Sequence, residues 1–187
     1  MAACNFPAMQ KLRPCVFFDR DGIVNVPPQG GARYIERPED FAIMPEFLAA
    51  LRIVNEHGYA AVIATNQKGV ALGRVREEAL MEMHSKLFTT VLQYGLRLLD
   101  IRVSITADNA HPSRKPNPGM LLGAAEEHGL DLKRSWMIGD HDYDIEAGRR
   151  AGCRTVFVGE HAVPGADFVV SNMAALVAFL DAKLEKV

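Results

Sequence analysis

The chain lacks several features that would assign it to a class at once. It has no apolar run of the roughly 18–20 residues that a membrane span requires, and its first residues do not join a basic start to an apolar stretch, as a signal peptide does. Its 21 basic and 23 acidic residues leave a net charge of −2, so no basic field would attract nucleic acid. We therefore expect neither a membrane nor a nucleic acid as partner.

Cysteine is scarce as well. The chain of 187 residues has three, Cys4, Cys15 and Cys153, and no CxxC pair. Such a set predicts neither a disulfide framework nor a zinc cage, and it favours the reducing cytoplasm. Internal repeats and low-complexity segments are also missing. We expect a loose leader over residues 1–13 and a single domain over residues 14–187.

Short apolar runs alternate with amphipathic segments along that domain. Strands are expected at residues 15–18, 59–65, 100–106, 135–140 and 154–159, and helices at residues 45–57, 77–94, 118–128, 145–151 and 173–184. Residues 26–45 are rich in proline and glycine and predict a long surface loop. This alternation predicts an α/β fold with a doubly wound, Rossmann-like parallel sheet, whose ligands bind beyond the carboxyl ends of the strands.

Three carboxylates stand at those predicted strand ends. Asp19 and Asp21 follow the apolar run "CVFF", and Asp140 follows "WMIG". Carboxylates that converge on one edge of a sheet repel one another unless a cation lies between them. Since all three offer oxygen ligands, the pattern predicts Mg²⁺.

Other polar groups at the same edge suit phosphoryl transfer. Thr65 ends the second strand, and the backbone amides of Asn66, Gln67 and Lys68 could hold an anion. Lys115 lies in the proline-stiffened segment "SRKPNPG". A metal and a lysine neutralise a phosphate so that a carboxylate can attack it, and an aspartate can form an aspartyl-phosphate.

Four segments resemble, in order, the motifs of the haloacid-dehalogenase-like (HAD) phosphatases. They are "FFDRDGIVN", "VIATNQKGVALG", "RKPNPGM" and "MIGDHDYDIEAG", and the resemblance spans roughly residues 14–180. Within this family, the segments most resemble those of the branch that holds heptose 1,7-bisphosphate phosphatases and histidinol phosphatases. A phosphomonoesterase acting on a small phosphorylated metabolite is therefore expected.

The resemblance implies roles for the catalytic residues. Asp19 would be the nucleophile and Asp21 the general acid and base. Thr65 would bind the transferred phosphoryl group, and Lys115 would neutralise it. Mg²⁺ would be held by Asp19, by the main-chain carbonyl of Asp21 and by Asp140.

The resemblance also implies supporting and substrate-binding residues. Asp144 would lie behind the catalytic residues and hold Lys115. Arg114 aligns with an arginine that recognises the substrate in this branch, while Asn66 and Gln67 would line the phosphate pocket. Tyr34, in the long loop, is expected near the substrate.

This chain departs from the branch at several positions. The segment "TADNAHPSRKP" has one histidine and no cysteine where many members carry a zinc loop, so we expect no zinc. Lys68 stands where the branch motif has serine, and Leu72 stands where it has arginine. Neither of the two usual insertion points is long enough for a large cap domain, so we expect an open site shaped by loops.

Several alternatives stay open at this stage. The substrate could be D-glycero-D-manno-heptose 1,7-bisphosphate or another sugar phosphate, or it could be histidinol phosphate. A signalling receiver domain with Asp108 as its phosphate acceptor, or a catalytically silent phosphate-binding module, would share the same fold. The sequence leaves the oligomeric state undetermined and is compatible with a monomer.

For Arg20 and the histidines the sequence supports only weaker predictions. Arg20 should point away from the metal and pair with an acid in the following loop. His141 is expected only to shape its loop. The remaining histidines considered, His57, His84, His128 and His161, are expected at the surface or at helix ends.

Overall fold

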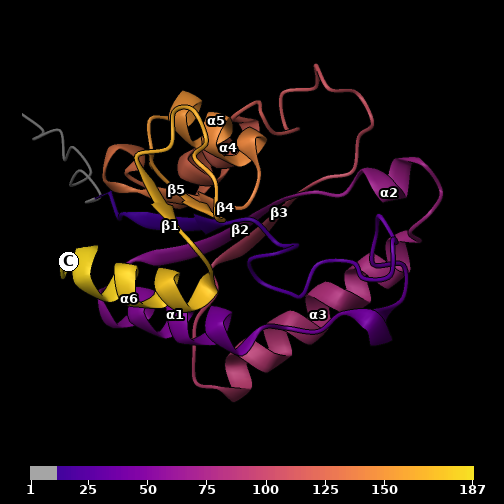
Figure 1. Cartoon of the computed structure of the whole chain (residues 1–187), viewed down its shortest axis with the longest axis horizontal. Helices are drawn as coiled ribbons and strands as arrows, with labels where there is room; N and C mark the ends of the chain where they lie inside the picture. The colour runs from indigo at the N-terminus through magenta and orange to yellow at the C-terminus, as the bar shows by residue number, and fades with distance from the viewer. Residues whose placement is uncertain (1–11) are drawn as a thin grey trace, which may run out of the picture.

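The computed structural model describes residues 12–187, so residues 1–11 of the expected leader lie outside this range. A single six-stranded parallel sheet has the order β3-β2-β1-β4-β5-β6 (Figure 1). The strands are β1 (Cys15–Phe18), β2 (Ala60–Asn66), β3 (Asp100–Ser104), β4 (Trp136–Gly139), β5 (Arg154–Val158) and β6 (Phe168–Val170). The chain builds outward in both directions from the central pair β1 and β4, so a ligand-binding crevice is expected where these two strands end.

Helices cover both faces of the sheet (Figure 1). One face carries α1 (Pro45–Glu56), α3 (Glu77–Gln93) and α6 (Met173–Lys183), and the other carries α4 (Gly119–His128) and α5 (Asp142–Ala151). The short elements are α2 (Lys68–Ala71) and the 3₁₀ turns η1 (Pro38–Asp40) and η2 (Leu132–Arg134). The predicted doubly wound α/β fold is confirmed.

The central strand β1 shows why its apolar residues run without interruption. Val16 and Phe18 belong to the core beneath α1, α3 and α6, whereas Cys15 and Phe17 belong to the core beneath α4. All four residues are fully buried. A parallel strand covered on both faces needs apolar residues at consecutive positions, and its rigid packing fixes the polar residues that follow it.

Three of the observed helices and strands differ most from the expected ones. Helix α5 begins at Asp142 rather than at residue 145, because the polar first turn hides the apolar periodicity. The Asp144 carboxylate accepts a hydrogen bond of 3.1 Å from the backbone N–H of His141 and so caps this turn. The edge strand β6 and the single-turn helix α2 are too short to give a periodic signal, and neither was expected.

The segments around the carboxyl edge contain no folded lid in the range 12–187. Between β1 and α1 the only regular element is the turn η1, and between β2 and β3 there are only α2 and α3. At the opposite end of the sheet, Arg13 donates from its side chain to the carbonyls of Gly58 and Tyr59. Within the described residues, no helix is long and apolar enough to cross a membrane.

Candidate active site

A buried lysine lies at the centre of the carboxyl edge of the sheet. The Nζ atom of Lys115 lies 2.7 Å from Asp19 Oδ1 and 2.6 Å from Asp144 Oδ1, and it donates to the carbonyl of Ala64 at 2.6 Å. All three charged side chains are buried. Asp19 follows β1, and Asp144 lies in the first turn of α5, so the sheet brings together residues from distant parts of the sequence.

The electrostatics of this trio disfavour the ionised form of both carboxylates beside a single ammonium. Burial raises the pKa of Asp19, and it raises the pKa of Asp144 to about 7, although Lys115 opposes both shifts. For Lys115 itself, burial alone would lower the pKa, but Asp144 and then Asp19 outweigh it and raise the pKa. Two carboxylates facing one ammonium favour the binding of a further cation.

Further potential metal ligands lie beside the trio. Asp19, Asp140, His141 and Asp144 each offer one ligand atom, and these atoms lie within 4.8 Å of one another. Asp140 follows β4 directly below the turn at Gly22, where an added Cβ would collide with the Asp140 carboxylate. The φ of +90° at Gly22 also favours glycine, so the sequence leaves room for this carboxylate. The oxygen-rich donor set suits a small hard cation.

The carboxylate of Asp21 lies outside this group and has its own partners. It accepts hydrogen bonds from Arg20 at 2.9 and 3.0 Å, from Asn25 at 3.0 Å and from Gln67 at 3.2 Å. Burial alone would raise the pKa of Asp21, but the charge of Arg20 and these hydrogen bonds lower it. Asp21 is therefore held as an anion with a fixed orientation.

The expectation for the partner of Arg20 was wrong. Arg20 is fully buried, and it pairs with the adjacent residue Asp21 instead of an acid in the following loop. Its guanidinium also lies 5.5 Å from the centre of the Phe41 ring. A sequence pattern could not show this pairing, because neighbouring residues of a regular strand point in opposite directions, and these two lie just beyond the strand end.

His84 also departs from the expectation that it lies at the surface or at a helix end. It lies within α3, is half-buried and has no hydrogen-bond partner at its buried Nε2 atom among the described residues. Burial and then the nearby Arg20 lower its pKa to about 4. This histidine therefore stays neutral at physiological pH, and it lies close enough to Arg20 and Asp21 for their charges to affect its pKa.

The residues after β2 join the two halves of the edge. Gln67 donates to Thr65 Oγ1 at 2.8 Å and thus connects Thr65 to Asp21. The Asn66 side chain exchanges two hydrogen bonds with the backbone of Lys115, at 3.0 and 3.1 Å. These contacts hold the lysine-bearing loop against the end of β2.

A cavity of about 350 Å³ opens above the buried trio. The predicted residues that line it are Asp21, Tyr34, Asn66, Gln67, Arg114 and Asp140. Asp19, Thr65, Lys115 and Asp144 lie below them and are buried. The structure thus brings all ten predicted site residues to one edge of the sheet.

The cavity also has lining residues that were not predicted as part of the site, among them Arg33, His141 and Tyr143, and it is lined by Lys68, of which only the backbone amide was expected to take part. His141 Nδ1 lies 2.9 Å from Asp140 Oδ1, a contact that raises the pKa of His141 to about 9, and its ring stacks on Tyr143 at 4.7 Å. His141 therefore does more than shape its loop. Adjacency to Asp140 was the only sequence signal for it.

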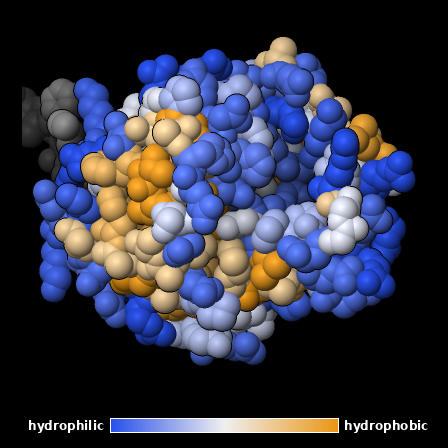
Figure 2. All heavy atoms as spheres, in the orientation of Figure 1, coloured by the Kyte–Doolittle hydropathy of each residue, from blue (hydrophilic) through white to orange (hydrophobic). Residues whose placement is uncertain are grey.

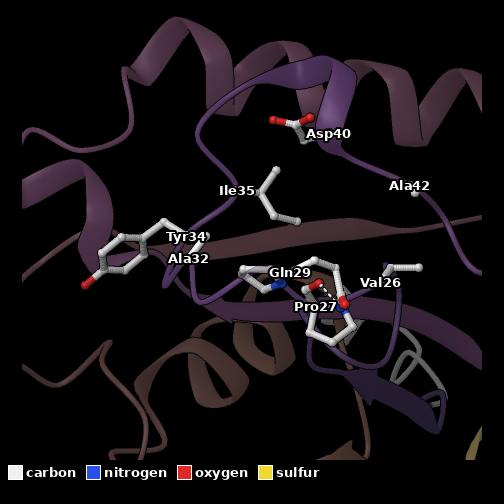
Figure 3. Close-up of a pocket in the computed structure, with 9 residues that line it drawn as sticks. Val26, Pro27, Gln29, Ala32, Tyr34, Ile35, Asp40 and Ala42 are labelled. Carbon is white, nitrogen blue, oxygen red and sulfur yellow. Dashed lines mark hydrogen bonds between the residues drawn. The ribbon is translucent and has the colours of Figure 1, made fainter.

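A second cavity of about 370 Å³ adjoins the first. Its walls come from the segment between Val26 and Ala42, and Pro27, Tyr34 and Ile35 are among the residues that line both cavities. Figure 3 shows Ile35 between the two limbs of this segment and Tyr34 projecting away from them. In Figure 2, the face on the side of α2 and α3 is mostly hydrophilic, whereas apolar residues gather on the side of α6.

Comparison with known proteins finds relatives over most of the chain. The HAD-hydrolase-like family model matches residues 112–173. The D-glycero-D-manno-heptose-1,7-bisphosphate 7-phosphatase of Thermosynechococcus vestitus is 32% identical over 90% of this chain and 95% of its own length. The D-glycero-beta-D-manno-heptose-1,7-bisphosphate 7-phosphatase of Rhodopseudomonas palustris is 37% identical over 75% of this chain and 80% of its own.

A solved structure is similar in fold. The D,D-heptose 1,7-bisphosphate phosphatase from B. bronchiseptica, solved in complex with magnesium and phosphate, has a TM-score of 0.79 and 26% sequence identity, covering 89% of this chain and 97% of that one. The expected resemblance to HAD-like phosphatases is therefore confirmed.

Proposed function

Because the chain belongs to the HAD-like phosphatases that include the heptose-1,7-bisphosphate 7-phosphatases, we propose that it hydrolyses a sugar phosphate, D-glycero-D-manno-heptose 1,7-bisphosphate, with Mg²⁺ and an aspartyl-phosphate intermediate. The family makes the protein a phosphoric monoester hydrolase, which sets aside the receiver domain and the silent binding module. The observation that carries the mechanism is the buried contact of Lys115 with Asp19 and Asp144, directly below an open cavity.

In the first half-reaction, an Asp19 carboxylate oxygen attacks phosphorus and the bond to the sugar oxygen breaks. Lys115, 2.7 Å from Asp19, offsets the negative charge that otherwise repels the phosphate. Thr65 would hydrogen-bond the transferred group. Asn66 keeps the Lys115 loop in position through its two backbone contacts.

Asp21 manages the protons in both half-reactions. Its contacts with Arg20 and Gln67 favour the ionised form, which accepts a proton from the attacking water. Protonation of the leaving oxygen requires a proton on Asp21, and a phosphate dianion close by favours that form because like charge raises a carboxyl pKa. Hydrolysis of the aspartyl-phosphate then restores Asp19.

The residues present fit a divalent cation. Asp19, Asp140 and the main-chain carbonyl of Asp21 would hold Mg²⁺, which supplies Lewis-acid polarisation of the phosphoryl oxygens when it is bound. Asp144 is engaged by Lys115 and serves to position it. We expect no zinc. The cytoplasmic location stays a prediction.

A substrate panel with purified protein tests this function. We expect heptose 1,7-bisphosphate to be hydrolysed with a higher kcat/KM than histidinol phosphate or an aryl phosphate. EDTA should remove the activity, and added Mg²⁺ should restore it. Activity that is insensitive to chelation would contradict the metal, and a preference for histidinol phosphate would make that compound the substrate instead.

A further inference from the structure

Tyr143 lines the active-site cavity but has no part in the mechanism described above. It is half-buried and belongs to the first turn of α5, which packs against β4 and β5. A helix that rests on the sheet gives its first turn a fixed position relative to the strand ends, unlike the loop that carries Arg33 and Tyr34. The sheet therefore sets the position of the Tyr143 ring.

The ring of Tyr143 covers one side of the buried lysine, with its centre 5.6 Å from Lys115 Nζ. Oxygen atoms of Asp19, Asp144 and the Ala64 carbonyl already lie within 2.7 Å of the same Nζ. An ammonium has three N–H donors, and these three oxygens can occupy all of them. The ring therefore adds a cation–π contact. Since Tyr143 lines the cavity and Lys115 does not, it also fills space through which water would reach Nζ.

A second ring fixes the orientation of Tyr143. The His141 ring stacks on it, with the two centres 4.7 Å apart and an angle of 12° between the planes. His141 is itself held in place, because its Nδ1 atom lies 2.9 Å from Asp140 Oδ1. A chain of contacts thus runs from Asp140 through the two rings to Lys115.

The contacts of Tyr143 with Lys115 and His141 are both made by its ring. Burial raises the pKa of Tyr143, and the carboxylates of Asp144 and then Asp19 raise it further. The phenol therefore stays protonated at physiological pH and does not act as a base. A phenylalanine at this position would keep both ring contacts.

From these contacts we infer that Tyr143 is a positioning residue for Lys115, whose ring keeps cavity water away from the contact between Lys115 and Asp19. Exclusion of water lowers the local dielectric constant, so the charge of Lys115 acts more strongly on the phosphoryl group in the transition state. This inference rests on the proposed function. It adds to the mechanism a residue to which the resemblance assigned no role.

Hydrolysis of p-nitrophenyl phosphate by Tyr143→Ala and Tyr143→Phe tests the inference. Alanine removes the ring and opens a path for water to Lys115, so kcat should fall roughly tenfold while KM changes little. Phenylalanine keeps the ring and should recover most of the lost kcat. An unchanged kcat in Tyr143→Ala would overturn the inference, as would an equal loss in Tyr143→Phe.

Tyr94→Ala is the matched control. Tyr94 follows α3, is 55% exposed and does not line this cavity, so its loss should leave kcat unchanged. A fall in kcat as large as that of Tyr143→Ala would show that loss of any tyrosine ring has this effect, and would overturn the inference. Circular dichroism checks that each variant is folded.

A measurement on Lys115 itself separates failure of this inference from failure of the proposed function. Heteronuclear NMR follows the exchange of the Lys115 ammonium protons with water, whether or not any ester is hydrolysed. The exchange rate should rise at least roughly tenfold in Tyr143→Ala and stay close to the wild-type rate in Tyr143→Phe. Equal rates in the wild type and Tyr143→Ala would overturn the inference. A wild type that hydrolyses no ester would overturn the proposed function, and the exchange rates would then decide the role of Tyr143 alone.

Discussion

The carboxyl edge of the sheet and the cavity wall above it hold their charges in different ways. At the edge, Lys115 and Asp144 are completely buried, and Asp19 is 7% exposed, so each charge depends on its partners. In the long loop that contributes to the wall, outside the residues that line this cavity, Arg37 is 65% exposed and its partner Asp40 is 49% exposed. The buried charges cannot be changed singly without a large cost, whereas water can replace most partners in the wall.

This difference separates chemistry from recognition. The edge holds the reacting groups within hydrogen-bond distance of one another, on rigid strands. The wall consists of loops whose residues can vary without disturbing the core. Substitutions at the edge should therefore reduce turnover of every substrate, and substitutions in the wall should change which substrate is preferred.

The largest effect is expected for Asp19→Asn. The amide cannot act as the nucleophile, so kcat for p-nitrophenyl phosphate should fall by at least about a thousandfold. Circular dichroism checks that the fold persists, and no phosphoenzyme should be trapped after acid quench. Near wild-type turnover in this variant would show that Asp19 is not the nucleophile. It would also show that the edge and the wall do not differ in function as described.

Lys115→Met should have the next largest effect. It leaves the buried carboxylates of Asp19 and Asp144 without their cation, so the free energy of unfolding should fall by about 3–5 kcal/mol. Denaturant unfolding measures the change. Lys86→Met is the control, since Lys86 donates to the carbonyl of Phe41 near the surface and should cost about 1 kcal/mol. Equal losses would show that burial does not distinguish the two regions.

His84 extends the buried region behind Asp21 and gives a pH dependence. Its pKa of about 4 in the folded state lies below the ordinary value of 6.5, so the unfolded chain binds the proton more tightly. Stability should therefore fall on acidification through the window from pH 6.5 to 4, by up to about 3 kcal/mol. Unfolding of wild type and His84→Gln across this window measures it, and the variant should lose less. If the free energy of unfolding fell equally with pH in the wild type and in His84→Gln, this pH dependence would not come from His84.

The smallest effect is expected in the wall, at Gly69→Ala. The new methyl group meets Val75 at 2.9 Å and Tyr34 at 3.0 Å, so the loop must shift, at a cost of about 1 kcal/mol in unfolding free energy. The KM for the bisphosphate should rise more than kcat falls. Gly123→Ala is the control, because nothing lies within 4 Å of that position in α4. A fall in kcat alone would place Gly69 with the catalytic edge.

Most of the acidic residues at the carboxyl edge of the sheet could be predicted from the positions of the apolar strands and their order along the chain. Asp19, Asp21 and Asp140 follow buried apolar runs, and a parallel sheet brings such positions to one side. The proline-stiffened segment before α4 indicated Lys115, and the resemblance to known motifs added Asp144. The pairing of Arg20 with Asp21 and the burial of His84 could not be predicted, because they depend on backbone beyond the regular strand and on the packing of α3.

The sequence by itself determined the order of the strands along the chain, the acids at their carboxyl ends and the absence of room for a cap. These follow from local patterns, since a strand buried on both faces needs consecutive apolar residues. Only the tertiary structure decided which charged side chains have a partner of opposite charge. It surrounds Lys115 with two carboxylates, whereas Arg33, Lys68 and Arg114, which line the cavity, form no ion pair within residues 12–187. Compensation is a matter of distance between side chains that lie far apart in the sequence, and only folding sets that distance.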